Sequence, residues 1–520
     1  RGALAAGLMA GGLSLAFAVV IPPFQAPDEP NHFLGFMALG DRAGERPQAD
    51  QWARIAHFKQ LRFNGAERYR PVDARQPQEA SWDDASPSDF DRRSSTTVAW
   101  RAIAGLTRHL PLPEAFLALR LAHACLLALA FAAAVWVVTL GAEAPFRHLA
   151  FVPLLVVPTL PFFGMHVSNH AFLASAYVLV ASGILLVFIG GRHACAAGVL
   201  LGAGMGLGLI AGRSSLPLLP LVGAAAASRL IIAGRAPANR LKDAALFWSG
   251  FALCLAGVHL LRGDIPQDRI DAVLAGLPGP ARRLDIFIEW PTAAGGVFFV
   301  ASMLAEWRLA RDSDAWTAGW PGAFTRGAAL AAALLLTLIL AGSLWLTYPH
   351  VASVDLLHRP PSWDYLRSVL ATAATPRLRD ADLLLTTSFW GGFGWLDRLL
   401  SPWAIAAYTG LTGVGLIVLL STIARTRNVP LFLRGALLFL GAAASLAVYA
   451  VGTLRYSPDI HGRYLLGLYL AGLAVCGSPL LMGIGPAPHG GSAGDRTSVL
   501  LATLLAMYAA VLWFVLGAYF

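Results

Sequence analysis

Two adjacent carboxylates stand between prolines in the segment 22–33, which reads Pro-Pro-Phe-Gln-Ala-Pro-Asp-Glu-Pro-Asn-His-Phe. They are Asp28 and Glu29, and they follow directly on an apolar stretch. Proline restricts the backbone around it, and a carboxylate at an apolar boundary accepts a proton more readily than one in water. The pattern predicts catalytic general bases at Asp28 and Glu29, with His32 beside them as a substrate-binding candidate. Capping of a helix that begins near Asn31 is the alternative interpretation.

An aromatic and glycine-rich motif covers residues 386–397, which read Thr-Thr-Ser-Phe-Trp-Gly-Gly-Phe-Gly-Trp-Leu-Asp. Glycines allow another molecule to approach the backbone closely, and aromatic faces suit sugar rings and lipid chains. Trp390 and Trp395 are therefore substrate-binding candidates. An aromatic belt at a membrane surface uses the same residue types and is the alternative.

A third motif, residues 455–464, holds two arginines, a histidine and two tyrosines. Arg463 precedes an apolar stretch, so we expect it in the first turn of a helix. The fork of an arginine side chain binds phosphate through two parallel hydrogen bonds. Arg463 is thus a phosphate-binding candidate, and Arg455, His461 and Tyr464 are candidates beside it. Arginines that reach lipid headgroups would give the same pattern.

Isolated ionisable residues interrupt other apolar stretches. Arg120 and His123 lie within the stretch 115–140, Arg213 lies in a turn between two stretches, and the turn 166–170 holds two histidines. Ionisable groups inside a membrane are costly and are mostly functional. A satisfied structural contact is an equally good interpretation of each.

The composition places these residues in a membrane protein. The chain has 520 residues, of which 57% are hydrophobic and 13% charged, and its mean hydropathy is +0.61. Soluble domains carry about 25% charged residues, so a soluble globular protein and a disordered one are both excluded. The net charge of +9 is typical of basic loops that meet anionic lipid. The sequence has no basic patch interleaved with aromatics, so no nucleic-acid partner is expected.

Apolar stretches of about 20 residues predict the transmembrane helices. About thirteen such stretches occur on this criterion, and we expect one all-α polytopic domain over residues 1–520. The first stretch ends in Ile21-Pro22-Pro23 rather than a cleavage site, which predicts a retained helix. The predicted spans are 3–23, 115–140, 149–166, 170–190, 194–212, 215–233, 244–261, 291–307, 326–347, 402–424, 431–451, 462–483 and 498–519.

The distribution of basic residues predicts an N-terminus in the cytoplasm, because Lys and Arg then gather in cytoplasmic loops such as 235–242. This orientation places all three motifs on or beside the external side. The predicted external segments are 24–114, 262–290, 348–401 and 452–461. The first is long, and its apolar periodicity predicts amphipathic helices on the membrane surface over 31–39 and 98–110.

Metal and disulfide chemistry have little support. The four cysteines form no Cys-x-x-Cys pattern and lie in or beside apolar stretches. Asp312-Ser313-Asp314 resembles a metal-binding triplet but falls on the predicted cytoplasmic side, and Asp83-Asp84 has no supporting residues. No cofactor is predicted, and no sequence motif supports a divalent metal.

The three motifs together, in their order and spacing, resemble the bacterial membrane family called domain of unknown function 2142. The resemblance covers residues 5–480. That family is similar to the GT-C superfamily of membrane glycosyltransferases, in which an external acidic residue just after the first span is catalytic. Asp28 matches that position, with Glu29 beside it. His170 departs from the resemblance, because an acidic residue is expected after Asn169.

The resemblance implies an enzyme that takes a sugar from a polyprenyl-phosphate carrier and places it on a glycan or lipid outside the bacterial cytoplasmic (inner) membrane. Arg463 and Arg213 match positions that hold the carrier phosphate, with Arg455 as a further candidate, and Arg120 matches a recurring Arg-Leu pair of the second span. Single displacement at the anomeric carbon would invert its configuration. A transporter of lipid-linked glycan and a noncatalytic member of an envelope assembly complex are the alternative functions.

Overall fold

The computed structural model describes about half of the chain. The described residues are 2–21, 26, 29, 32–33, 36, 98–140, 152–155, 157–189, 194–211, 215, 218–229, 243–251, 253–254, 392–393, 398–426, 429–456, 465–478 and 506–516. The predicted spans 291–307 and 326–347 and most of the external segments 24–114, 262–290 and 348–401 lie outside these residues.

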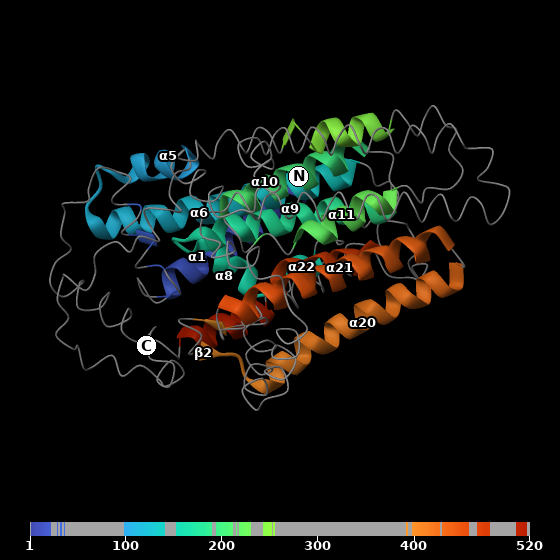
Figure 1. Cartoon of the computed structure of the whole chain (residues 1–520). Coiled ribbons are helices and arrows are strands. Elements are labelled where there is room, and N and C mark those ends of the chain that lie inside the picture. Colours follow the sequence, from blue (N-terminus) through green and yellow to red (C-terminus); the bar gives the residue numbers. More distant parts are fainter. Residues whose placement is uncertain are drawn as a thin grey trace.

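The described part of the chain is a bundle of apolar helices (Figure 1). Four of its helices are long and apolar enough to cross a membrane: α1 (Gly2–Val20), α6 (Leu112–Leu140), α9 (Asn169–Ile189) and α20 (Pro402–Thr426). Further apolar helices are α10 (Ala194–Ala211), α11 (Leu218–Ser228), α21 (Val429–Tyr456), α22 (Leu466–Cys476) and Ala506–Leu516. The expectation of a helical membrane protein is confirmed.

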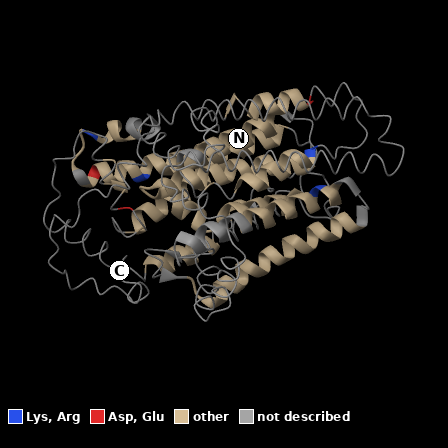
Figure 2. Cartoon of the chain, in the orientation of Figure 1, with Lys and Arg blue, Asp and Glu red and all other residues tan. Residues whose placement is uncertain are grey.

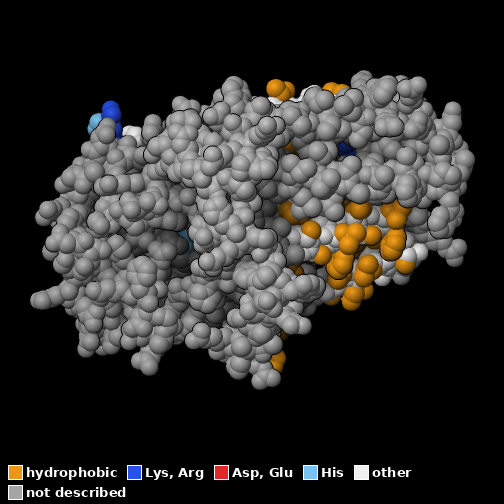
Figure 3. Space-filling view, in the orientation of Figure 1, with side chains coloured by type: hydrophobic (Ala, Val, Ile, Leu, Met, Phe, Trp, Pro, Cys, Tyr) orange, Lys and Arg blue, Asp and Glu red, His pale blue; other side chains and the backbone are white. Residues whose placement is uncertain are grey.

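Charge and apolar surface are distributed as a membrane requires. Among the described residues, Lys, Arg, Asp and Glu lie toward the two ends of the bundle (Figure 2). Hydrophobic side chains gather on the surface over α20 and α21 (Figure 3), where Trp403, Ile417 and Phe439 are 86%, 64% and 74% exposed. Side chains of this kind are stable at such a surface when lipid, rather than water, covers them.

The centre of the bundle is α9, which is buried from Ala171 to Phe188. It packs against α6, α10 and α22, while α1 packs on α6 and α21 packs on α11. A helix that is apolar all round is stable only when other helices or lipid surround it. The sequence of α9 therefore accounts for its central place.

Small residues set the register between α1 and α6. A Cβ added at Gly7 would meet the carbonyl oxygen of Ala128 at 2.7 Å and the Cβ of Ala132 at 2.8 Å, and one at Gly11 would meet the Cβ of Ala128 at 2.9 Å. Close helix contacts in membranes depend on such small residues. The two helices run antiparallel, and the register brings the C-terminal end of α1 opposite Arg120.

The predicted span 149–166 is not one helix, and this prediction is wrong. The structure has two short helices there, α7 (Val152–Leu155) and α8 (Thr159–Met165). Pro158 lies at the start of α8 with φ −62°, and a proline has no N–H to continue a preceding helix. α8 then turns back through residues 166–168 into α9.

Two shorter elements come from the polar segments. Helix α5 (Val98–Thr107) occupies the predicted amphipathic region 98–110 and packs on α6, with Ala104 buried and Leu106 exposed. Strand β1 (Gly392–Phe393) lies in the aromatic and glycine-rich motif and pairs antiparallel with β2 (Arg398–Leu399), which follows the motif directly. Each strand has two residues, so the described part of the chain remains helical in class.

Candidate functional site

A buried ion pair joins the first motif to the bundle. Arg120 Nε donates to Glu29 Oε1 at 2.9 Å, and Arg120 Nη2 donates to Glu29 Oε2 at 2.7 Å. The side chains are 1% and 0% exposed. Two parallel hydrogen bonds of this kind are among the strongest that side chains make. The residues are 91 positions apart in the sequence, so the pair fixes a contact between distant segments.

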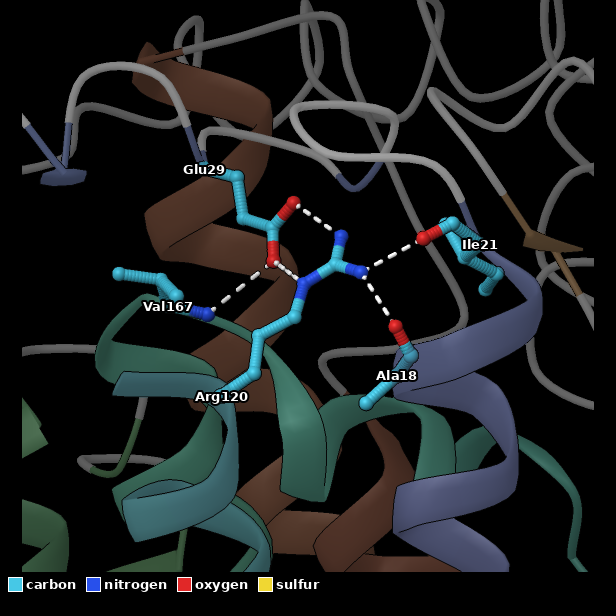
Figure 4. Close-up of polar contacts among 5 residues, drawn as sticks. All are labelled: Ala18, Ile21, Glu29, Arg120 and Val167. Carbon is cyan, nitrogen blue, oxygen red and sulfur yellow. Dashed lines mark hydrogen bonds and ion pairs between the residues drawn. The ribbon is translucent and has the colours of Figure 1, made fainter. Parts of the chain in front are cut away.

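The other edge of the same guanidinium binds the end of α1. Arg120 Nη1 donates to the carbonyl oxygens of Ala18 at 2.9 Å and Ile21 at 2.6 Å. Figure 4 shows the guanidinium between these two carbonyls and the Glu29 carboxylate. The last carbonyls of a helix have no partner within the helix and attract a cation. Arg120 therefore caps α1 while it holds Glu29.

Glu29 also contacts the turn between α8 and α9. The Val167 N–H donates to Glu29 Oε1 at 3.3 Å, and the Glu29 N–H donates to the carbonyl oxygen of Ala26 at 3.3 Å. The Arg120 guanidinium carbon lies 4.7 Å from the centre of the Phe116 ring, within the range of a cation–π contact. The pair thus links α1, α6, the α8–α9 turn and the segment that carries the two carboxylates.

These contacts decide what Glu29 and Arg120 can do chemically. Buried charges are stable only when they are paired and hydrogen-bonded, and here both carboxylate oxygens accept hydrogen bonds. A substrate would have to displace one of these partners to reach either side chain. The geometry therefore favours an anchoring role for Glu29 and Arg120 over proton transfer by Glu29 or substrate binding by Arg120.

Aromatic and histidine side chains pack around the anchored segment. The His123 ring makes edge contacts with Phe36 at 5.7 Å and Phe172 at 5.8 Å between ring centres. His32 is also described and is 8% exposed. The ion pair itself is 1% and 0% exposed, and the exclusion of water strengthens its electrostatic attraction.

The α8–α9 turn brings two further histidines to this end of the bundle. His166 contacts Phe162 edge-on with ring centres 4.3 Å apart, and His170 stacks on Phe163 at 5.0 Å. Both histidines flank Val167, whose N–H binds Glu29. In the described part of the chain, no three His, Cys, Asp or Glu side chains are grouped so that they could hold a metal ion.

Described parts of the other two motifs lie toward the same end. α9 begins beside Glu29, and near its other end the carbonyl of Phe188 accepts a hydrogen bond of 2.8 Å from Arg434 Nη1. From Arg434, α21 returns toward the start of α9 (Figure 1), and Arg455 is its penultimate residue. Strand β1 contacts α8, which precedes the α8–α9 turn. Three segments far apart in the sequence thus approach one end of the bundle.

Several predicted site residues lie outside the described part of the chain. They are Asp28, Arg213, Trp390, Trp395, His461, Arg463 and Tyr464. Arg455 lies within α21, so the helix continues beyond the predicted span 431–451 into the predicted external segment 452–461. Sequence reasoning missed the backbone partners of the ion pair at Ala18, Ile21 and Val167. The position of Arg120 inside an apolar stretch could have indicated that such partners exist, because a buried arginine requires hydrogen-bond acceptors.

The chain matches no protein-family model, no curated protein sequence and no solved structure.

Proposed function

We propose that this protein is a GT-C-type membrane glycosyltransferase that moves a sugar from a polyprenyl-phosphate carrier to a glycan or lipid acceptor. The proposal includes about thirteen membrane segments, of which 149–166 is the broken pair α7 and α8. It also includes a cytoplasmic N-terminus and an external active site in the bacterial inner membrane. The observation that carries it is the Arg120–Glu29 anchor, which ties the acidic segment to the end of an apolar bundle. Such an arrangement suits a lipid-linked donor, whose tail stays in the membrane while its phosphate and sugar reach the surface.

In the proposed reaction, Asp28 accepts the proton of an acceptor hydroxyl. The hydroxyl oxygen attacks the anomeric carbon, and the bond from that carbon to the carrier phosphate oxygen breaks. Polyprenyl phosphate leaves with the bonding electron pair. Arg463, aided by Arg213 or Arg455, stabilises the negative charge that develops on the leaving group. One displacement inverts the anomeric centre.

The remaining candidates are proposed to orient the substrates. Trp390 and Trp395 offer aromatic faces to a sugar ring or a lipid chain. His32, His461 and Tyr464 offer hydrogen bonds to sugar hydroxyls. No metal-dependent step is proposed.

The test compares Asp28→Asn with wild type in a strain that lacks the protein, with surface glycans weighed by mass spectrometry. We expect the variant to lose a sugar-sized mass that wild type adds. Glu114→Gln is the matched control, because Glu114 is an exposed carboxylate in the first turn of α6. Normal transfer by Asp28→Asn at equal protein level would disprove the assigned base.

A second measurement separates the enzyme from a transporter. Purified protein in vesicles is given a polyprenyl-phosphate sugar, and both covalent transfer and movement of the lipid between leaflets are recorded. Transporters place polar groups near the bilayer midplane, whereas the described charges lie toward the ends of the bundle. Lipid movement without transfer would replace the enzyme with a transporter.

A further inference from the structure

We infer that Glu29 and Arg120 form a latch that positions the segment carrying Asp28, and that neither side chain acts on the substrate. The latch consists of this ion pair, the carbonyls of Ala18 and Ile21 and the N–H of Val167. The inference deepens the proposed function and rests on it for its catalytic purpose. It makes Glu29 and Arg120 positioning residues for the reaction.

The first argument is that the guanidinium of Arg120 is already occupied. One edge binds both oxygens of Glu29, the neighbouring Nη1 binds two carbonyls, and the Phe116 ring lies 4.7 Å from the guanidinium carbon. The side chain is 1% exposed. A carrier phosphate could bind Arg120 only after displacing Glu29, which would leave a carboxylate buried without its cation.

The second argument is that the latch reaches Asp28 through the covalent chain. Consecutive Cα atoms are about 3.8 Å apart, so a fixed Glu29 restricts where Asp28 can lie. The hydrogen bond from the Glu29 N–H to the Ala26 carbonyl ties the residues on both sides of Asp28. A misplacement of about 1 Å can slow a reaction about a hundredfold, so a loose segment would slow transfer without weakening carrier binding.

The latch is tested first by the accessibility of Ala26, which is 0% exposed. An Ala26→Cys variant is treated with a membrane-impermeant maleimide in whole cells, and labelling of the protein without this substitution is subtracted. Adding Glu29→Gln should raise the labelling rate at least about tenfold, because the unpaired segment can leave its buried place. The matched control is Arg108→Gln, since Arg108 is exposed at the end of the α5 region and contacts its neighbour His109.

An unfolded variant would also be labelled quickly, so a second variant is needed to separate loss of the latch from unfolding. Glu29→Gln combined with Arg120→Gln removes both buried charges together, which costs less than removing one. We expect this double variant to recover the folded protein peak in gel filtration while Ala26→Cys stays reactive. Protection of Ala26→Cys in the presence of Glu29→Gln, or in this double variant, would overturn the latch.

The catalytic purpose is tested by Arg120→Lys, which keeps the charge but loses the fork. We expect kcat to fall at least about tenfold while KM for the polyprenyl-phosphate sugar stays within about twofold, because positioning acts on the reacting geometry. A raised KM with unchanged kcat would overturn the inference and make Arg120 a carrier ligand. If wild type transfers no sugar, the proposed function fails, whereas the accessibility result still decides whether the latch exists.

Discussion

A carboxylate that is buried against an arginine acquires a different chemistry from one that faces water. Asp28 and Glu29 are equivalent candidates by residue type and spacing, since both follow the same apolar stretch. The structure pairs Glu29 with Arg120. That contact crosses 91 positions, so local spacing could not reveal it. The sequence predicts that Arg120 must have an acceptor, but only packing decides which one.

Removing one charge of the pair should cost more stability than removing both. Arg120→Met leaves Glu29 buried without a cation, and we expect it to lower the free energy of unfolding by about 3–5 kcal/mol. Arg120→Met combined with Glu29→Leu should regain most of that loss, because neither charge then needs water. Thermal inactivation of detergent-purified protein, followed by fluorescence-detected gel filtration, measures both. A double variant less stable than the single one would contradict the prediction.

A single hydroxyl should contribute measurably to how the helix Ala506–Leu516 docks. Tyr508 is 1% exposed, and its hydroxyl donates to the carbonyl oxygen of Leu155 at 2.6 Å. Tyr508→Phe keeps the ring and leaves that carbonyl with one partner fewer, so we expect a loss of about 0.5–1.5 kcal/mol. The same thermal assay checks it, with Trp513→Phe as the control because Trp513 is 78% exposed. Equal effects of the two substitutions would count against the role of the hydrogen bond.

Helices are the elements that the sequence predicts best, because an apolar stretch of membrane length has few alternatives. The predicted spans 3–23, 115–140 and 170–190 coincide closely with α1, α6 and α9. The break at Pro158 was missed, because an average over an apolar window does not register one proline. The paired strands at 392–399 were missed because two-residue strands have no periodicity.

The α1–α6 register should depend on one glycine far more than on its neighbour on the exposed face. A Cβ at Gly7 would meet the Ala128 carbonyl oxygen at 2.7 Å, whereas in the described part of the chain a Cβ at Gly12 would meet nothing within 4 Å. We expect Gly7→Val to force the helices apart and to lower stability by at least about 2 kcal/mol, in the range of overpacked cores. Gly12→Val should change it by less than about 0.5 kcal/mol.

A change in the packing of α1 on α6 should also disturb the ion pair. If α1 moves along α6, the carbonyls of Ala18 and Ile21 leave Arg120 Nη1, and the segment after α1 loses its anchor. Gly7→Val should therefore also expose Ala26→Cys to maleimide, although position 7 lies near the opposite end of α1. Protection of Ala26→Cys in folded Gly7→Val protein would show that the latch does not depend on the register.

At the scale of the whole molecule, the two ends of the bundle must face different compartments. The Arg120–Glu29 pair lies beside the N-terminal end of α9, and Arg434 binds the carbonyl of Phe188 near the C-terminal end of that helix. The cluster of basic residues at 235–242 follows α11 in the sequence. Because basic loops stay in the cytoplasm, we predict that the end bearing the ion pair faces outward.

Cysteine labelling tests this orientation at one position for each side. Arg108→Cys should react with a membrane-impermeant maleimide in intact cells, because position 108 lies between α5 and the start of α6, the helix whose Arg120 binds Glu29. Arg235→Cys should react only after the cells are permeabilised, since it belongs to the basic cluster. Labelling of the chain's own cysteines is measured on the unsubstituted protein and subtracted. The reverse pattern would place Asp28 in the cytoplasm, where a lipid-linked sugar donor could not serve an external acceptor, and the proposed function would fall with the topology.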